Sequence, residues 1–297
     1  MDGIGAGMTE AGNQDRQQWE RRLAWQSQVV LGAVLLPVIA ALAAQIAFLQ
    51  ALPALILTGL LISAAFALLV WKLRAGTAGA AIAGGLITTE LYFAVPGWRT
   101  VLWVVLALFL MTFGATRFGR SRKERIGAAE SRHGRSASQV AANLGVAAWM
   151  GILVCASHFF SVSAGIFSGR AALVALIAAA AEATADTLSS ELGQVLGGEP
   201  FLVTTFRRVA PGTDGAVSLA GTAAGCLGAL AAVTVAALVL PLSSKMAALA
   251  LAGGVFGLFF DTLLGATLER SGWLNNDSVN FLSTLAAAIV ASLLTLA

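Results

Sequence analysis

Two carboxylates lie one helical turn apart at the end of an apolar run. Glu182 and Asp186 belong to the segment AAAAEATADTLSSELG (178–193), and residues four apart share one face of a helix. An unpaired carboxylate at this depth in a membrane costs about 2–3 kcal/mol. The pair therefore predicts a compensating arginine, metal ion or proton, as found at functional sites. The structural alternative is a carboxylate that caps a neighbouring helix or pairs with an arginine.

A second acidic residue repeats part of this segment. Asp261 in FFDTLLG (259–265) begins the same Asp-Thr-Leu triplet, 75 positions after Asp186. If both segments cross a membrane in the same direction, the two carboxylates lie at a similar depth. Mg²⁺ prefers oxygen ligands and commonly takes one or two carboxylates together with substrate phosphates. We therefore expect Asp186 and Asp261 to bind Mg²⁺.

The loop that follows residue 193 carries groups suited to phosphate. The sequence GTDG (212–215) forms a turn before the next apolar run, and Arg207 and Arg208 precede it. Backbone N–H groups at a helix start bind anions, and guanidinium groups bind phosphate bidentately. An ordinary turn with topology-setting arginines explains the same residues equally well.

A polar stripe enters the fifth apolar run. Arg135, Gln139 and Asn143 follow i, i+4, i+8 spacing and so occupy one face of a helix. Such a stripe needs polar partners inside a membrane, which the carboxylates described above could supply. By contrast, we expect most of the cations of 117–125 to face water or lipid headgroups.

Amide and acid groups also gather at the start of the last apolar run, as Asn275, Asn276, Asp277 and Asn280. One of them can cap the helix. The others exceed that need, so we expect this helix start to be buried against the site or to contact substrate.

These residues belong to a chain with the composition of an integral membrane protein. Of its 297 residues, 58% are hydrophobic and 11% are charged, which excludes a soluble globular domain. We predict an all-α, polytopic bundle of about nine transmembrane helices in a single domain (29–297). A polar tail (1–28) precedes it, in which 16–28 can form an interfacial helix. The nine apolar runs are 29–49, 53–71, 77–95, 99–116, 138–158, 170–190, 216–240, 246–265 and 278–296.

The 18 basic residues predict the orientation of this bundle. With the connections numbered alternately, one side holds 15 of them and the other holds Arg99, Arg170 and Lys245. The positive-inside rule places the first side and the N-terminus in the cytoplasm, so basic charge here indicates topology and not a nucleic-acid partner. The polar clusters all fall on that side. A one-sided site favours an enzyme of the cytoplasmic membrane over a pore, whose polar groups would follow a path across the bilayer.

Four motifs resemble one membrane family, which includes phytyl-phosphate kinase of plants and cyanobacteria and animal transmembrane protein nineteen. The resemblance covers roughly residues 30–297, and GRSASQVAANLGVAA (134–148) shares it. The pattern Asp-x-x-Ser-Ser-x-x-Gly followed by Gly-Thr-x-Gly-x-x-Ser is more remotely similar to dolichol kinase and CTP-using phosphatidate cytidylyltransferases. The motifs are ADTLSSELG (185–193), PGTDGAVSLAGTAAGCLGA (211–229), FGLFFDTLLGATLER (256–270) and NNDSVNFLST (275–284).

The resemblance implies phosphoryl transfer from a nucleoside triphosphate, CTP by analogy, to a prenyl monophosphate such as phytyl phosphate. The expected partners are this lipid, the nucleotide and membrane lipids, with Mg²⁺ as cofactor. Asp214 departs from the neutral residue common in related sequences, and it fits a phosphate site if it helps to hold Mg²⁺. Together with the chemistry above, the expected catalytic residues are Asp186, Asp261, Arg207 and Arg208, and the expected binding residues are Arg135, Asn143, Glu182, Ser190, Glu191, Gly212, Thr213, Gly215, Ser218, Asp277 and Asn280.

Two other functions stay open at this point. A small-solute or ion transporter could use Glu90, Glu182 and Asp186 as a relay, since Glu90 also lies within an apolar run. A non-catalytic lipid-binding protein would bind a prenyl phosphate without turnover.

Overall fold

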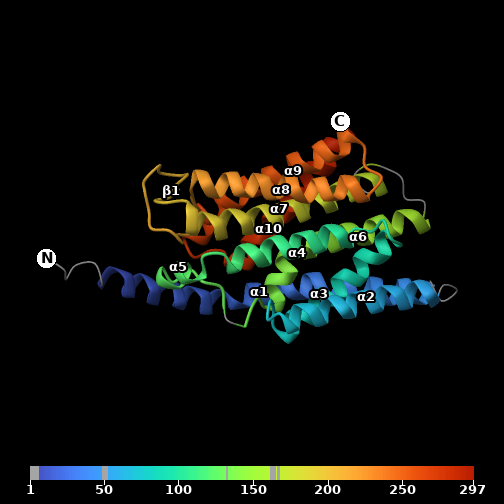
Figure 1. Cartoon of the computed structure of the whole chain (residues 1–297), viewed down its shortest axis with the longest axis horizontal. Coiled ribbons are helices and arrows are strands. Elements are labelled where there is room, and N and C mark those ends of the chain that lie inside the picture. Colours follow the sequence, from blue (N-terminus) through green and yellow to red (C-terminus); the bar gives the residue numbers. More distant parts are fainter. Residues whose placement is uncertain (1–6, 49–52, 132, 161–164, 166–167) are drawn as a thin grey trace.

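The computed structural model describes residues 7–48, 53–131, 133–160, 165 and 168–297, and these form a helical bundle (Figure 1). Each of the nine apolar runs is a helix, which confirms the predicted all-α polytopic bundle. Among the described residues, seven helices are long and apolar enough to cross a membrane, and α3 and α4 are shorter apolar helices. The elements are α1 (Gly7–Phe48), α2 (Pro53–Lys72), α3 (Ala78–Ala94), α4 (Leu102–Arg117), α5 (Arg120–Arg125), α6 (Ala137–Phe160), α7 (Gly169–Leu196), β1 (Phe201–Leu202), β2 (Ala216–Val217), α8 (Leu219–Val239), α9 (Ser244–Leu264), the π-helix η3 (Gly265–Glu269) and α10 (Asn276–Leu296).

The polar segment 16–28, for which the sequence predicts a possible interfacial helix, is helical in the structure. It is the amino-terminal part of α1, which continues without a break into the first apolar run. The start of α10 holds this part of α1 in line with the bundle. Gln26 donates to the Trp273 carbonyl at 2.8 Å, and Asn275 Nδ2 donates to the Leu23 carbonyl at 3.0 Å. These hydrogen bonds fix this part of α1 against the start of α10.

Helix α7 forms the centre of the bundle and packs against α4, α6, α8, α9 and α10. Its buried face is mostly alanine, and the facing helices contribute glycine, so the backbones approach closely. A Cβ at Gly225 of α8 would lie 2.9 Å from the Ala185 carbonyl oxygen, and one at Gly257 of α9 would lie 2.5 Å from Glu182 Cγ. This close packing brings the acidic face of α7 against α9.

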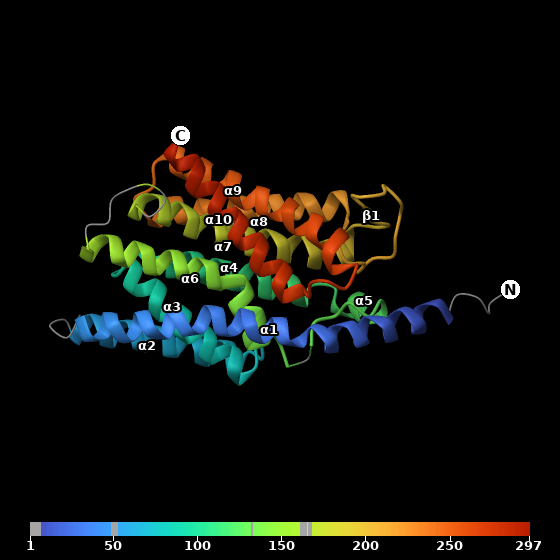
Figure 2. The same ribbon diagram turned by 180° about the vertical axis from the view of Figure 1, so that it is seen from behind.

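Helices α1, α2 and α3 form a separate layer on the other side of α6 (Figures 1 and 2). Helices α1 and α3 pack on α6, and α2 packs on α3. Helix α4 packs mainly on α7 and α8, and the two layers meet through α6 and through the contact of α1 with α10.

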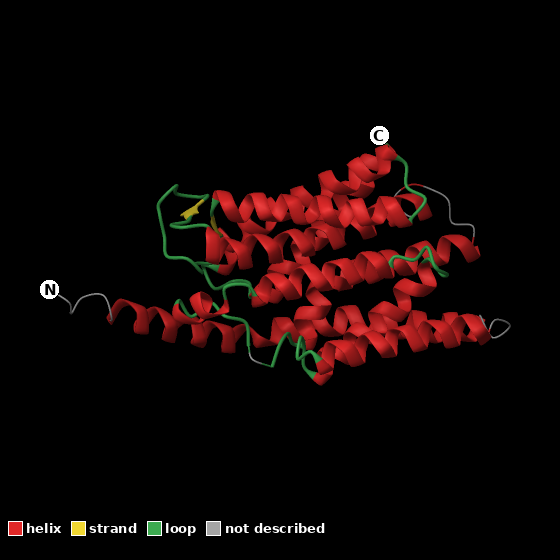
Figure 3. Cartoon of the chain, in the orientation of Figure 1, coloured by secondary structure: helices red, strands yellow, loops and turns green. Residues whose placement is uncertain are grey.

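One end of the bundle carries the N-terminal part of α1, α5 and the loop with β1 and β2, and the C-terminus lies at the opposite end (Figures 1 and 3). We call the first of these the basic end. Strands β1 and β2 pair antiparallel, with Phe201 opposite Val217. The loop before α6 is fixed by two backbone bonds of Arg135, whose N–H donates to the Ala75 carbonyl and whose carbonyl accepts from Thr77 N, both at 3.0 Å. These bonds fix the position of Arg135 at the basic end of the bundle.

Candidate active site

A polar cavity of about 680 Å³ lies at the basic end of the bundle. It is enclosed by the first turns of α6, α8 and α10, the last turns of α7 and α9, and the loops 127–131 and 211–217. All but four of the predicted site residues line it. Those in the lining are Arg135, Asn143, Asp186, Ser190, Glu191, Gly212, Thr213, Gly215, Ser218, Asp261 and Asn280.

The acidic residues of α7 and α9 meet at this cavity. The side chain of Asp186 neighbours that of Asp261, and both line the cavity. Glu182 lies one turn deeper, is 1% exposed and stands outside the lining. The Ser283 hydroxyl of α10 approaches the carboxyl groups of Glu182 and Asp261. Within the described chain, Glu182 Oε1 and Asp261 Oδ1 are buried with no hydrogen-bond partner, so these acceptor atoms have unused binding capacity.

Arg135 is the basic side chain nearest this acidic group. It neighbours Asp186, and its Nη2 donates to Thr187 Oγ1 at 3.2 Å. Among the described residues of the cavity wall, Arg135 is the one basic residue. The acidic ones are Glu130, Asp186, Glu191, Asp214, Asp261 and Glu269. Glu191 is ion-paired with Lys123, whereas Asp186 and Asp261 lie together inside the bundle, where neighbouring carboxylates call for a compensating cation.

The donor set fits Mg²⁺. Asp186 and Asp261 come from different helices and offer oxygen ligands, and Asp261 retains a buried oxygen without a partner. In the described part of the chain, no three His, Cys, Asp or Glu side chains form a ready metal cage. Mg²⁺ sites of the nucleotide type need only one or two carboxylates, because phosphates and water complete the shell.

The turn at residues 212–215 forms another wall of the cavity. Gly212 and Gly215 have φ values of +86° and +67°, which are accessible to glycine at little cost. A Cβ at Gly215 would lie 1.9 Å from Ala266 N at the start of η3. The turn ends at Ser218, whose hydroxyl accepts from Gly221 N at 3.1 Å and caps α8. The positive end of α8 therefore faces the cavity, as suits an anion.

Comparison with known proteins identifies the family of the chain. Residues 61–288 match the family described as integral membrane protein DUF92. The chain belongs to this family. A further match is an uncharacterized membrane protein of Methanocaldococcus jannaschii, 34% identical over 239 residues, which are 79% of this chain and 92% of that protein. No solved structure matches.

Two relatives of this DUF92 protein come from Arabidopsis thaliana. The chloroplastic protein VTE6 is 31% identical over 231 residues, which cover 76% of this chain and 66% of VTE6. Protein PGR is 28% identical over 276 residues, which cover 78% of this chain and 93% of PGR. These findings confirm the family drawn from the four motifs, that of phytyl-phosphate kinase and transmembrane protein nineteen.

The structure keeps two predicted catalytic residues of the DUF92 chain out of the cavity. Arg207 and Arg208 lie exposed in the loop between β1 and β2 and do not line it. Arg208 Nη1 instead lies 2.7 Å from Glu199 Oε2, in a pair that is largely exposed on both sides. The pairing of the strands directs this loop outward, so Arg135 replaces the two arginines as the cation of the site.

Asp277 also stands apart from the cavity. It is 8% exposed in the first turn of α10 and does not line the cavity wall. The cap of α10 is Asn275, whose Oδ1 accepts from Ser278 N at 2.9 Å. Asn280, one turn further on, lines the cavity. The helix start is thus buried against α1 on one face and open to the site on the other.

Lys123 is an exception to the expectation that most cations of 117–125 face water or headgroups. It is fully buried, and its Nζ donates to the carbonyls of Ala115 at 2.9 Å and Thr116 at 2.8 Å and to Glu191 Oε2. Glu191, expected to contact nucleotide, therefore joins α5 to α7 although it also lines the cavity. The sequence does not predict this burial, because nothing in the spacing of Lys123 distinguishes it from the basic residues around it.

Proposed function

We propose that this protein is a membrane enzyme that transfers a phosphoryl group from a nucleoside triphosphate to a prenyl monophosphate, with the basic end toward the cytosol. The observation that carries the proposal is the meeting of Asp186 and Asp261, from different helices, on the wall of a polar cavity. The cavity volume of about 680 Å³ falls within the range of about 300–1,000 Å³ typical of small-molecule sites. Phosphoryl transfer relies on positioning and charge neutralisation, which such a site supplies.

Each part of the reaction has residues suited to it. Asp186 and Asp261 would hold Mg²⁺, which when bound neutralises charge on the nucleotide phosphates. The Arg135 guanidinium, beside Asp186, would orient the transferred phosphoryl group. The turn at 212–215 and the start of α8 would bind phosphate oxygens through backbone N–H groups. Asn143 and Asn280 line the same cavity and would position the acceptor.

The acceptor needs no general base from the protein. An oxygen of the prenyl phosphate is already anionic, and it attacks the γ-phosphorus of the nucleotide. The bond from that phosphorus to the β-phosphate oxygen breaks, which releases a nucleoside diphosphate and leaves a prenyl diphosphate. The charges therefore need stabilisation by cations and dipoles, and no proton must be removed.

The test uses purified full-length protein in lipid nanodiscs with Mg²⁺, phytyl phosphate and each of CTP, ATP, GTP and UTP labelled in the γ-phosphate. CTP is the expected donor, because the motifs resemble those of dolichol kinase and CTP-using cytidylyltransferases. Labelled phytyl diphosphate should form, and Asp186→Asn should slow its formation by about 10²–10³-fold. Glu199→Gln, which alters an exposed carboxylate outside the cavity, is the control. No transfer from any nucleotide, or an Asp186→Asn variant as fast as wild type, would overturn the proposal.

A further inference from the structure

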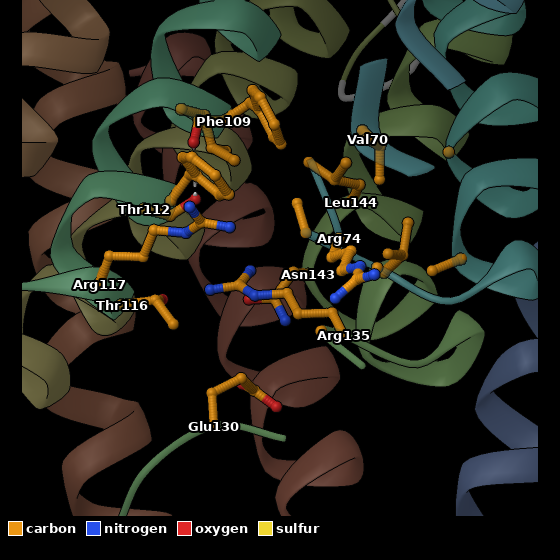
Figure 4. Close-up of a pocket in the computed structure, with 18 of the residues that line it drawn as sticks. Val70, Arg74, Phe109, Thr112, Thr116, Arg117, Glu130, Arg135, Asn143 and Leu144 are labelled. Carbon is orange, nitrogen blue, oxygen red and sulfur yellow. Dashed lines mark hydrogen bonds between the residues drawn. The ribbon is translucent and has the colours of Figure 1, made fainter. Parts of the chain in front are cut away.

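A second pocket, of about 190 Å³, lies between α2, α3, α4 and α6 (Figure 4). Its walls are apolar over most of their length. They include Phe66 and Val70 of α2, Val105 and Phe109 of α4, and Leu144 of α6. Because α4 packs on α7 and α8 while α2 packs on α3, the pocket occupies the space between the two layers.

Arginine side chains gather at one end of this apolar pocket. Figure 4 shows the guanidinium groups of Arg74, Arg117 and Arg135 directed into the same space near Asn143. Arg135 lies beside Asp186 of the polar cavity, and Arg74 and Arg117 form no ion pair within the described chain. Arg117 Nη2 donates to the Leu73 carbonyl at 2.8 Å and its guanidinium lies 4.1 Å from the Phe113 ring centre, and these contacts hold the side chain in place.

The remaining charged groups at this end do not cancel the arginines. Arg120 also lines the pocket and pairs with Glu124 at 3.1 Å. Glu130 is the one acidic residue in the described lining, and its Oε1 accepts from Ser131 N at 3.3 Å. Positive charge therefore exceeds negative charge at the mouth of an apolar pocket, a combination that fits an amphiphilic anion.

The chain turns at Arg74, immediately after α2. Arg74 has a φ of +51°, a left-handed conformation that is common at the end of a helix, and Ala75 N donates to the Val70 carbonyl at 3.0 Å across it. This helix ending places an arginine at the pocket wall.

The apolar pocket and the polar cavity share part of their walls. Glu130, Ser131, Arg135 and Asn143 line both. An anion held by Arg135 at the mouth of the pocket would therefore lie beside the cavity that contains Asp186 and Asp261. The two spaces provide adjoining sites, one apolar with a cationic mouth and one polar with carboxylates.

We propose that the apolar pocket is the acceptor site, with the lipid phosphate on Arg74, Arg117 and Arg135 and the first part of an isoprenoid chain between α2 and α4. This inference rests on the proposed transfer to a prenyl phosphate. The pocket volume of about 190 Å³ is below the about 300–1,000 Å³ that encloses a drug-sized ligand, so the rest of the chain extends into the bilayer. The edge-to-face rings of Phe66 and Phe109, with centres 5.3 Å apart, bridge α2 and α4 where the chain would pass between the helices.

Gly84 is a position from which a larger side chain would extend into the pocket. It lies on α3 in the pocket lining, and a Cβ there would meet only Val140 Cγ1, at 4.0 Å. Leucine also favours a helix more than glycine does, so Gly84→Leu should fold. The matched control is Gly114→Leu on α4, since Gly114 is exposed, lies outside the lining and has nothing within 4 Å of a Cβ.

The experiment measures binding of tritiated phytyl phosphate to the full chain in nanodiscs, without nucleotide. Gly84→Leu should weaken binding about 10-fold or more, and Gly114→Leu should bind as wild type does. The double variant Arg74→Gln/Arg117→Gln should weaken phytyl phosphate binding and leave phytol binding unchanged. The acceptor site would be overturned if Gly84→Leu bound phytyl phosphate with wild-type affinity. It would also be overturned if inorganic phosphate displaced the lipid at equal concentration, which would indicate a simple anion site.

The same variants separate this inference from the proposed function. Specific binding of phytyl phosphate that Gly84→Leu abolishes, in a protein that transfers nothing, would retain the lipid site and reject the kinase. Transfer that continues in Gly84→Leu with an unchanged KM for phytyl phosphate would retain the kinase and reject the site.

Discussion

The carboxyl group of Asp186 on α7 is a neighbour of the carboxyl group of Asp261 on α9, on the wall of the polar cavity. Both helices end at this cavity, and glycines of α9 let the two backbones approach. Two carboxylates this close together repel each other unless a cation or proton lies between them. A divalent ion bound between the two carboxylates should therefore stabilise the folded protein.

Mg²⁺ should raise the thermal stability of the wild-type protein through this pair. An ion that binds the folded state alone adds about 2.7 kcal/mol at 100 times its Kd. Asp261→Asn should lose most of this gain, and without metal it should unfold at the same temperature as wild type or higher, because a like-charge contact is removed. Tryptophan fluorescence on heating, with Mg²⁺ or with EDTA, measures both effects.

Glu199→Gln is the control for the metal effect, because Glu199 is exposed and outside the cavity. It should keep the full response to Mg²⁺. A normal Mg²⁺ response in Asp261→Asn would remove this residue from the metal site.

Lys123 should be necessary for stability. Its Nζ is buried against Glu191 and two carbonyls at the end of α4, and removing one partner of a buried ion pair costs about 3–5 kcal/mol. Lys123→Met should therefore lower the unfolding temperature strongly. Lys72→Met, which alters an exposed lysine, should change it little.

The double variant Lys123→Met/Glu191→Met separates loss of the pair from loss of packing. It should recover part of the stability, because no charge is left buried alone. If Lys123→Met alone unfolds at the wild-type temperature, the ion pair contributes nothing to the fold.

The sequence is sufficient to predict most of the helices and the proximity of Asp186 and Asp261. In lipid, a spanning segment must satisfy its backbone hydrogen bonds internally, so long apolar runs become helices regardless of their partners. The repeated Asp-Thr-Leu around Asp186 and Asp261 also indicates a shared depth, which the structure shows as side-chain proximity. Both inferences depend on local pattern alone.

Other parts of the site depend on packing between distant segments. Lys123 resembles its basic neighbours in sequence, and it is buried only because α4 and α7 supply three oxygen acceptors around it. Arg207 and Arg208 follow the expected pattern for a phosphate site, yet the pairing of β1 with β2 directs them outward. The converging Arg74, Arg117 and Arg135 come from three separate segments, which no spacing rule connects.

Gly215→Ala should damage both stability and nucleotide binding. The residue has a φ of +67°, and a Cβ would lie 1.9 Å from Ala266 N, so the turn must move away from η3. Gly198→Ala is the matched control, because Gly198 has a φ of +64° and nothing within 4 Å of a Cβ. Gly198→Ala should lower the free energy of unfolding by only about 1–2 kcal/mol, the cost of an alanine in the left-handed conformation.

Gly215→Ala should cost more than this control, and it alone should raise the KM for the nucleotide. Thermal unfolding and initial rates against nucleotide concentration measure the two effects. Equal losses in the two variants would show that the contact with η3 has no importance.

Ser218→Ala should show whether this serine only caps α8. Its hydroxyl accepts from Gly221 N at 3.1 Å, and the Ser243 hydroxyl caps α9 by accepting from Met246 N at 3.2 Å. Ser243→Ala is the matched control. Ser218→Ala and Ser243→Ala should each lower the free energy of unfolding by about 1 kcal/mol. Because Ser218 also lines the cavity, only Ser218→Ala should raise the KM for the nucleotide. Equal KM values in both variants would make Ser218 a cap and nothing more.

Glu90→Gln tests the transport alternative. Glu90 is fully buried on α3, accepts from Gln45 Nε2 at 2.9 Å and stands outside the lining of the cavity. A relay would require it to exchange protons or ions with Glu182 and Asp186, whereas the described hydrogen bond joins it to α1. We expect Glu90→Gln to leave the rate of phosphoryl transfer within about twofold, a change of about 0.4 kcal/mol in the barrier. Proteoliposomes with an imposed proton or sodium gradient supply the opposing measurement, since gradient-driven uptake by wild type that Glu90→Gln abolishes would favour a transporter.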